Sequence, residues 1–184
     1  MMKVHEVPAD QTSIISFDPL SVLQLGMVAD EIIDRLSRYR PEFTNLLHMQ
    51  RVAGCRISEL FQPERWQLIS SSQLQVQPQK GNKLRTLNLA DLGNMNVETF
   101  ERTLIDMHRL PQRQYERAFS FVVAEVGLWR RYDAGFMHPS SHMLRHLKIK
   151  ELRAQGYDTE YIANWIGEKA VASLDDYLDS VFFV

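Results

Sequence analysis

The segment Ser140-Ser-His-Met-Leu-Arg-His146 opens a predicted helix whose apolar residues recur at helical spacing as far as Gln155, where Gly156 is a stop signal. His142 and Arg145 lie three residues apart. On a helix, this spacing places both side chains on one face, so that they can meet a single phosphate together. The segment therefore indicates a helix that carries a pair of groups suited to an anion.

His142 and His146 also stand four residues apart, as in helical zinc sites. However, Met143 occupies the position where the zinc protease motif has a catalytic Glu, and no third ligand stands out. The single cysteine, Cys55, excludes an internal disulfide and a thiolate zinc cluster, and we expect it to be buried. We therefore expect no metal ion and no cofactor. A histidine that is simply hydrogen-bonded at a helix start is the alternative reading of His142.

Three other short segments carry residues of related chemistry. Arg56 lies in the segment Gly54-Cys-Arg-Ile-Ser-Glu-Leu60, which also suits a helix start with Arg56 paired to Glu59 at the surface. Lys80 begins Lys80-Gly-Asn-Lys83, which is typical of a hairpin turn. Tyr177 lies near the end of the chain, where a tyrosine is most often a packing residue. Each of these residues alone has a structural explanation.

In chain order, the residues Arg56, Lys80, His142, Arg145 and Tyr177 form a set that can cut a DNA phosphodiester without a metal. Two arginines can hold the non-bridging oxygens of a phosphate, while a lysine and a histidine can move protons. A tyrosine hydroxyl can attack phosphorus and form a covalent link between protein and DNA. The order and spacing of the set carry this prediction.

Charge is unevenly distributed along the chain. The formal net charge of −2 at pH 7 is unusual for a protein that binds DNA. Counted over Lys, Arg, Asp and Glu, residues 1–50 carry −3, residues 51–155 carry +6 and residues 156–184 carry −5. Four of the five set members lie in the basic middle, whereas Tyr177 is surrounded by aspartates that oppose the approach of DNA. An ordinary solvated surface is the alternative, because an excess of +6 is modest over this length.

The apolar pattern predicts a mainly α chain with a small antiparallel β-sheet, an α+β fold. Asp18 and Pro19 predict the cap and first residue of a helix that runs to about Tyr39. A second helix is expected to end near Gly54, with a short helical stretch after it. Strands are expected at 66–69, 73–77 and 84–89, and the turn at 80–83 joins the last two of them. Further helices are expected at 97–110, 112–130, 140–155 and 158–166. With 184 residues, 45% of them hydrophobic, and no apolar run near the roughly 20 residues of a bilayer span, we expect a soluble cytoplasmic domain.

Over about residues 40–180 these segments resemble the catalytic domain of the tyrosine recombinases, the phage integrase family. The segment around Arg56 resembles the family's first-arginine box, and Lys80-Gly-Asn-Lys-Leu-Arg85 resembles its β-hairpin. His142-Met-Leu-Arg-His146 resembles the His-x-x-Arg box. Ile166-Gly-Glu168 resembles the Leu-Gly-His stretch, and Tyr177 follows Glu168 by nine positions, as in the family. The resemblance implies the tyrosine recombinase catalytic-domain fold.

The family's chemistry implies a role for each residue. Tyr177 would be the nucleophile that forms a 3′-phosphotyrosine and frees a 5′-hydroxyl, while Arg56 and Arg145 stabilise the charge on phosphorus. Lys80, rather than Lys83, would protonate the leaving 5′-oxygen, and His142 would assist proton transfer at the nucleophile.

Glu168 departs from the family pattern, which has a His or Trp there that donates a hydrogen bond to phosphate. An ionised carboxylate only accepts hydrogen bonds and repels an anion, so we expect slower cutting. Outside this catalytic set, we expect Lys83, Arg85 and His146 to contact double-stranded DNA. No membrane partner is expected.

In domain terms, residues 1–40 are expected to be an N-terminal extension and a first helix packed on the same domain, with residues 41–184 forming the catalytic domain and a C-terminal tail. The apolar end Val181-Phe-Phe-Val184 would either pack on a neighbouring chain in a tetramer on DNA or dock on its own core. The expected function is site-specific DNA recombination or integration, as in mobile genetic elements. The alternatives are a non-cleaving DNA-binding or regulatory protein and a topoisomerase related to type IB.

Overall fold

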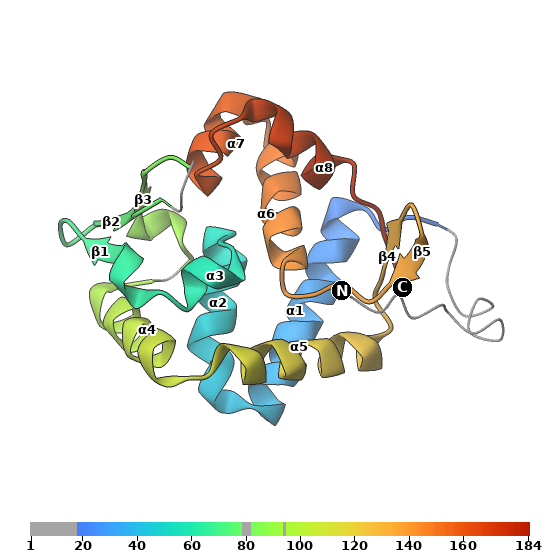
Figure 1. Ribbon diagram of the computed structural model, residues 1–184, viewed down its shortest axis with the longest axis horizontal. Helices are drawn as coiled ribbons and strands as arrows, with labels where there is room; N and C mark the ends of the chain where they lie inside the picture. The colour runs from blue at the N-terminus through green and yellow to red at the C-terminus, as the bar shows by residue number, and fades with distance from the viewer. Residues whose placement is uncertain (1–17, 79–81, 94) are drawn as a thin grey trace.

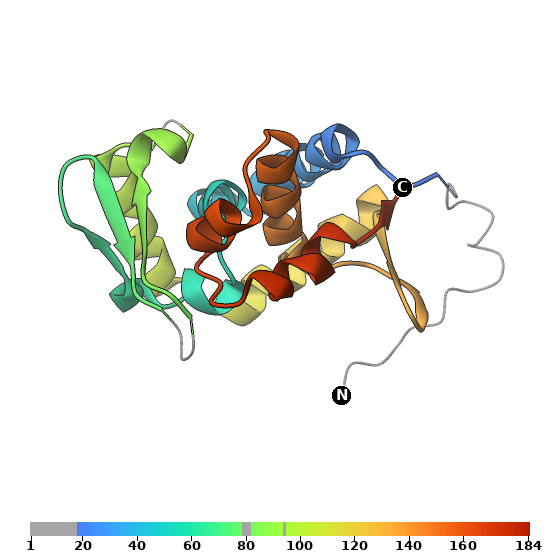
Figure 2. The same ribbon diagram turned by 90° about the horizontal axis from the view of Figure 1, so that it is seen from above.

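The computed structural model describes residues 18–78, 82–93 and 95–184. This part of the chain is mainly helical with two small antiparallel sheets, which lie at opposite ends of the molecule with helices between them (Figures 1 and 2). The predicted α+β class is confirmed. The helices are α1 (Val22–Tyr39), α2 (Thr44–Ala53), α3 (Ile57–Leu60), α4 (Val97–Arg109), α5 (Gln112–Val126), α6 (Met143–Ala154), α7 (Thr159–Ile166) and α8 (Leu174–Leu178), with short 3-10 helices at Pro41–Phe43, Pro63–Arg65, Leu89–Asp91 and Val171–Ser173.

Helix α6 is the centre of the core and packs against α1, α2, α7 and α8 (Figure 1). Leu144, Leu147 and Ile149 of α6 are fully buried, so the apolar face predicted from the sequence is the one that packs. Helix α1 contacts α2, α5 and α6, which joins the first helix to the same core.

The start of α1 differs from the prediction. The helix begins at Val22, and its cap is Ser21, whose hydroxyl accepts a hydrogen bond from the backbone N–H of Gln24. The Gln24 side chain in turn accepts one from the backbone N–H of Ser21, which completes a capping box. The predicted cap at Asp18 was therefore wrong, because this reciprocal pair satisfies the first N–H groups three residues later.

The first sheet consists of β1 (Trp66–Leu68), β2 (Gln73–Val76) and β3 (Arg85–Asn88) in the order β1-β2-β3. Leu74 lies opposite Leu87 and both are buried, as the alternating pattern predicts. Lys80, which lies between β2 and β3 in the sequence, is outside the described residues.

The second sheet was missed by the sequence analysis. It consists of β4 (Trp129–Tyr132), β5 (Gly135–Met137) and β6 (Phe182–Phe183) in the order β5-β4-β6. The helix predicted over 112–130 was wrong at its end, because Gly127 adopts a left-handed conformation (φ 76°) that stops α5 after Val126.

The C-terminal strand β6 pairs with β4 of its own chain, and Phe182 and Phe183 are buried there. The segment that contains α7 and α8 therefore connects α6 to β6, which is paired in the second sheet. This segment passes over one end of α6 (Figure 1). None of the described helices has the length and apolar composition needed to cross a bilayer.

Candidate functional site

Arg145, in the first turn of α6, is the most enclosed charged residue of the site. Its side chain is 0% exposed. Nη1 donates to the carbonyl of Gly54 at 2.9 Å, and Nη2 donates to the carbonyl of Ile166 at 3.2 Å and to Glu168 Oε1 at 2.9 Å. Nε donates to the hydroxyl oxygen of Tyr177 at 3.2 Å. Four partners from three separate segments thus fix the orientation of this guanidinium.

Arg56 reaches the same place from the position just before α3. Gly54 ends α2 with φ 63°, and an added Cβ there would lie 2.9 Å from Lys148 Cγ, so only glycine suits the turn that leads to Arg56. Nη2 of Arg56 donates to Glu168 Oε1, the oxygen that Arg145 also contacts. The two arginines of the predicted set therefore converge.

Glu168 lies between the two arginines, one residue after Gly167, which ends α7 in a left-handed conformation. Glu168 is 6% exposed, and its Oε1 accepts a hydrogen bond from each guanidinium. A carboxylate oxygen held by two arginines is in the position that a phosphate oxygen would need for the same contacts. The carboxylate thus occupies an anion position inside the site.

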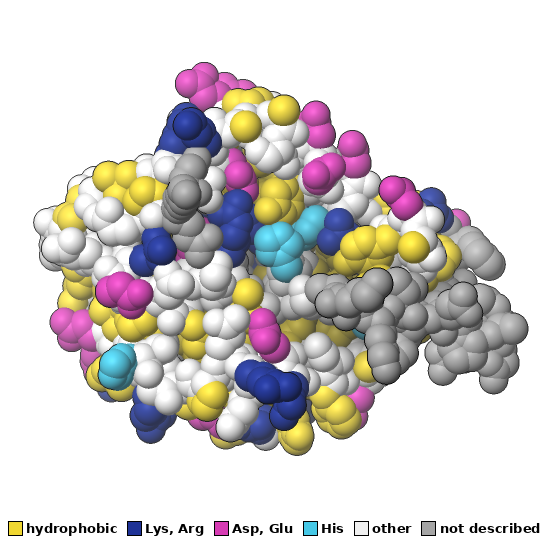
Figure 3. Space-filling model, viewed as in Figure 1, with side chains coloured by type: hydrophobic (Ala, Val, Ile, Leu, Met, Phe, Trp, Pro, Cys, Tyr) yellow, Lys and Arg dark blue, Asp and Glu magenta, His cyan; other side chains and the backbone are white. Residues whose placement is uncertain are grey.

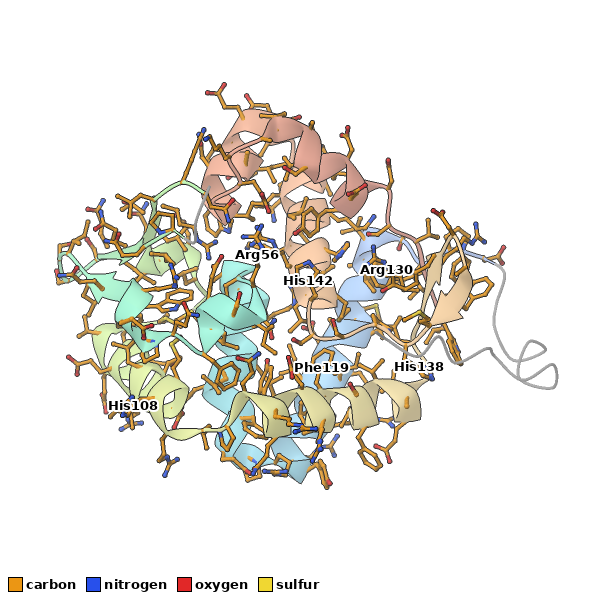
Figure 4. All side chains as sticks on the ribbon, in the orientation of Figure 1. Arg56, His108, Phe119, Arg130, His138 and His142 are labelled. Atoms are coloured by element: carbon orange, nitrogen blue, oxygen red, sulfur yellow. The ribbon has the colours of Figure 1, made fainter. Side chains whose placement is uncertain are left out.

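Tyr177 and His142 complete the group. The ring centroids of Tyr177 and His142 are 5.5 Å apart. Burial, with the nearby charges of Arg145 and Arg56, lowers the pKa of His142 to about 4. His142 is therefore neutral near pH 7 and able to accept a proton. Figure 4 shows His142 at the start of α6 with Arg56 beside it, and on this face Figure 3 shows histidine and basic side chains gathered together.

His146 was expected to contact DNA, and the structure places it inside the protein. Its ring is 3% exposed and lies 4.6 Å from the Tyr177 ring, measured between centroids. Its Nδ1 lies 2.9 Å from Ser180 Oγ, and its Nε2 lies 3.2 Å from Nη1 of Arg130. Burial, followed by the charge of Arg130, lowers the pKa of His146 to about 2. The expectation of a surface contact was wrong, because the ring is buried against Tyr177 and its two nitrogens are held by Ser180 and Arg130.

Arg85 was also expected to contact DNA and is instead buried on β3. Nη2 donates to Glu59 Oε2 at 2.6 Å, and Nη1 donates to the carbonyl of Trp165 at 3.1 Å. The other oxygen of Glu59 lies 3.4 Å from Nη1 of Arg56. Glu59 is therefore buried rather than at the surface, and its carboxylate bridges Arg56 and Arg85. The Arg85 side chain lies in the interior of the site.

Lys83 is exposed, as a DNA contact requires. Its backbone N–H donates to the carbonyl of Gly167 at 3.1 Å, which ties the end of the β2–β3 turn to the residue before Glu168. An added Cβ on Gly167 would lie 3.2 Å from the Lys83 carbonyl oxygen. The catalytic lysine of the prediction, Lys80, lies outside the described residues, three positions before this contact.

Two residues that support the site were not singled out from the sequence. Arg130 comes from the missed strand β4, and Ser180 contacts both His146 and the carbonyl of Tyr177. The Arg130-Arg131 pair, twelve residues before His142, is the signal that could have indicated a basic strand here. Within the described ranges, no cluster of three His, Cys, Asp or Glu side chains is placed to hold a metal.

Compared by sequence, the chain matches no protein-family model and no curated protein. Compared by structure, it is similar to XerA recombinase (TM-score 0.58, 18% identity), covering 95% of this chain and 64% of that one. It is also similar to a lambda integrase dimer bound to a COC' core site (TM-score 0.63, 18% identity, 88% of this chain and 48% of that one). A third similar structure is the XerH site-specific recombinase bound to a difH substrate (TM-score 0.56, 18% identity, 86% and 49%).

The chain thus spans about half to two thirds of the length of these recombinases. The likeness confirms the expected fold: the described structure has the fold of the tyrosine recombinase catalytic domain.

Proposed function

We propose that the chain is a site-specific DNA recombinase that cuts and rejoins double-stranded DNA through Tyr177. The convergence of three side chains carries the proposal. Arg145 donates to the Tyr177 hydroxyl oxygen at 3.2 Å and to Glu168 Oε1 at 2.9 Å, and Arg56 contacts the same carboxylate oxygen. A nucleophilic oxygen and two guanidinium groups therefore surround one position suited to an anion.

The proposed reaction begins when the scissile phosphate binds between Arg56 and Arg145. The Tyr177 oxygen attacks phosphorus, the bond from phosphorus to the 5′-oxygen breaks, and a 3′-phosphotyrosine forms. Neutral His142 assists removal of the hydroxyl proton, and Lys80 supplies a proton to the leaving 5′-oxygen. The arginines stabilise the charge that develops on the non-bridging oxygens. Rejoining is the reverse attack by a 5′-hydroxyl, and it needs no external energy source because the phosphotyrosine conserves the bond.

Glu168 makes this reaction conditional. Because its carboxylate holds both arginines in the described conformation, a DNA phosphate has to take its place or bind beside it. Two anions at one pair of cations repel each other, so the approach of DNA favours movement of Glu168 away from the arginines. Turnover is then expected to be slower than with a hydrogen-bond donor at this position.

The same observation favours a second candidate, a protein that binds DNA without cutting it. In that case Glu168 would remain between the arginines while DNA contacts the surrounding surface. Three exposed aspartates beside the nucleophile, Asp175, Asp176 and Asp179, point in the same direction.

A covalent-capture experiment separates the two candidates. The protein is incubated with suicide DNA substrates that lose a short strand after cutting, and adducts that resist SDS are counted. We expect an adduct with the native sequence and none with Tyr177→Phe, which keeps the ring but lacks the attacking oxygen. Intact DNA binding with no adduct on any of several candidate sites would favour the non-cleaving protein.

We also propose that the chain self-associates on DNA, as a tetramer, and acts on a mobile genetic element in the cytoplasm. Among the described residues β5 is an edge strand of the second sheet, and an edge strand can pair with a neighbouring chain. Sedimentation of the intact protein with and without duplex DNA measures this association, and a monomer on every DNA tested would contradict it.

A further inference from the structure

Arg130 is a cation beside the nucleophile that the reaction above does not use. Side chains alternate along β4, so Arg130 and Tyr132 share one face while Arg131 lies on the other. The Arg130 guanidinium lies 4.4 Å from the centre of the Tyr132 ring, and Nη1 is 3.2 Å from His146 Nε2. Nε is buried and has no hydrogen-bond partner. No carboxylate forms an ion pair with Arg130 in the described part of the chain.

A chain of hydrogen bonds joins Arg130 to the nucleophile. An arginine can only donate, so His146 accepts at Nε2 and carries its proton on Nδ1. Nδ1 then donates to Ser180 Oγ at 2.9 Å, and the Ser180 hydroxyl donates to the Tyr177 carbonyl at 2.6 Å. These bonds hold the Arg130 guanidinium at a fixed place relative to the backbone of Tyr177.

The surroundings of Arg130 contain an excess of positive charge. The nearby histidines, His142 and His146, are neutral near pH 7, and the charge of Arg130 contributes to the lowered pKa of both. Burial lowers the pKa of Lys150, the charge of Asp179 raises it, and Arg130 lies close enough to lower it further; the Lys150 ammonium group donates to the carbonyl of Leu178 at 2.8 Å. Partial burial of a cation without a counter-ion costs free energy of desolvation, and a bound anion offsets that cost.

The position of Arg130 suits the backbone of a bound strand. In Figure 4, Arg56, His142 and Arg130 follow one another across the same face, with His142 between the two arginines. Figure 3 shows basic and histidine side chains gathered on this face. A DNA strand carries a phosphate at about every 3.4 Å of helix axis, so a strand with one phosphate at Arg56 and Arg145 has further phosphates on both sides.

We propose that Arg130 binds a phosphate of the DNA backbone next to the phosphate that Tyr177 attacks, on the side of Tyr177 away from Arg56. The inference rests on the proposed function in taking DNA as the ligand. Through His146 and Ser180, a phosphate held at Arg130 is kept in register with the nucleophile. The ligand is a DNA phosphodiester, because the neighbouring arginine pair already provides the place for the scissile group of the same strand.

The test compares two adjacent arginines on opposite faces of β4. Arg130→Gln and Arg131→Gln remove the same charge, but Arg131 is exposed and lies over the rings of Phe136 and Phe183. Binding of the full chain to a fluorescein-labelled random-sequence duplex is measured by anisotropy at several NaCl concentrations. We expect Arg130→Gln to reduce the slope of log K against log salt by about 0.9, the value for one lost phosphate contact, and Arg131→Gln to change it less.

Two further variants keep the result interpretable. Arg130→Met suits the apolar rings beside it and serves if the glutamine variant is unfolded by thermal denaturation. Arg130→Lys retains the charge and should keep the salt slope of the native protein. A role confined to positioning His146 would lower the adduct yield of Arg130→Gln without changing the slope, and this outcome would overturn the phosphate contact.

The remaining outcomes separate this inference from the proposed function. Equal slope losses in Arg130→Gln and Arg131→Gln would mean a general effect of charge and would overturn the inference. A loss specific to Arg130, in a protein that forms no Tyr177 adduct, would support the inference and contradict cleavage. No binding of the native chain to the duplex at low salt would overturn the inference as well.

Discussion

The two halves of the site are built on different electrostatic principles. On the side of the first sheet, arginines alternate with carboxylates: Arg85 pairs with Glu59, which also faces Arg56, and Arg56 pairs with Glu168. On the side of the second sheet, the rings of Tyr177, His142 and His146 and the guanidinium of Arg130 lie together, and no carboxylate pairs with Arg130 among the described residues. In the first half two carboxylates offset most of the charge of three guanidinium groups, Arg145 included, whereas in the second half the charge of Arg130 has no carboxylate beside it among the described residues.

The two halves therefore depend on different kinds of support. Ion pairs hold the arginine half, and removal of one partner leaves a buried charge. Ring packing and the strand β6 hold the tyrosine half, so removal of apolar area is the more damaging change there. The following changes to the chain, in decreasing order of the effect we expect, test this division.

Truncation after Ser180 removes β6 and with it the support of the tyrosine half. Phe182 and Phe183 are buried, and loss of one large aromatic side chain from a core costs about 3–5 kcal/mol. We expect the free energy of unfolding, measured in urea, to fall by about 5 kcal/mol or more. A truncated chain that keeps its stability but no longer assembles on DNA would instead mean that the tail serves a neighbouring chain.

Glu59→Gln tests the arginine half. The substitution leaves the buried guanidinium of Arg85 without its carboxylate, and breaking a buried pair costs about 3–5 kcal/mol. Glu64→Gln, an exposed change of the same charge five residues later, is the control and should stay within about 0.5 kcal/mol of the native protein. Equal urea midpoints for the two variants would show that the buried pair does not hold this half together.

Acid should weaken the tyrosine half. The folded pKa of His142 is lowered to about 4, below the ordinary 6.5, so the unfolded chain binds a proton that the folded chain does not. Stability is therefore complete above about pH 6.5 and falls as the pH drops toward 4, by about 1.4 kcal/mol per pH unit for this group.

His142→Gln should reduce that dependence, measured by urea unfolding between pH 7 and pH 4.5. His108→Gln, which changes an exposed histidine of α4 far from the site (Figure 4), should keep the native slope. If both variants keep the native slope, the acid sensitivity belongs to another group.

Glu168→Gln tests the boundary between the halves. With a neutral amide between Arg56 and Arg145, the pair can bind an added anion, and 10 mM sulfate should stabilise the variant by about 1 kcal/mol if its dissociation constant is in the low millimolar range. The native protein and the exposed control Glu160→Gln should respond less in the same thermal unfolding assay.

We also expect Glu168→His to raise the yield of the Tyr177 adduct, and a lower yield would assign Glu168 a positive role in the reaction.

Local sequence patterns predicted the parts of the fold formed by neighbours in the chain. The helix with His142 and Arg145 and the strands of the first sheet follow from periodicity and turn residues within short windows. The second sheet was missed because β4 is short and its partner β6 lies about fifty residues later, so no local pattern shows the pairing.

The candidate site was predicted in its residue types better than in their surroundings. Arg56, Arg145, His142, Glu168 and Tyr177 are brought together, as the spacing of the motifs suggested. Arg85 and His146 were expected to contact DNA, but partners from distant segments compensate their burial. Arg85 donates to the Glu59 carboxylate, and the His146 ring contacts the Ser180 hydroxyl and the Arg130 guanidinium. Which residue compensates a buried charge depends on tertiary contacts that one sequence does not show.

Under the proposed function, the hydrogen bond from Arg145 to Tyr177 bears on which chain would perform the cut. Both residues belong to one chain, and the segment that carries the tyrosine is attached on one side to α7 and on the other to β6 of that same chain. A protomer of the proposed recombinase would therefore attack in cis the phosphate bound by its own arginines, without a nucleophile donated in trans. In an assembly on DNA, each chain would then be a complete cutting unit, and contacts between chains would serve to time the cuts.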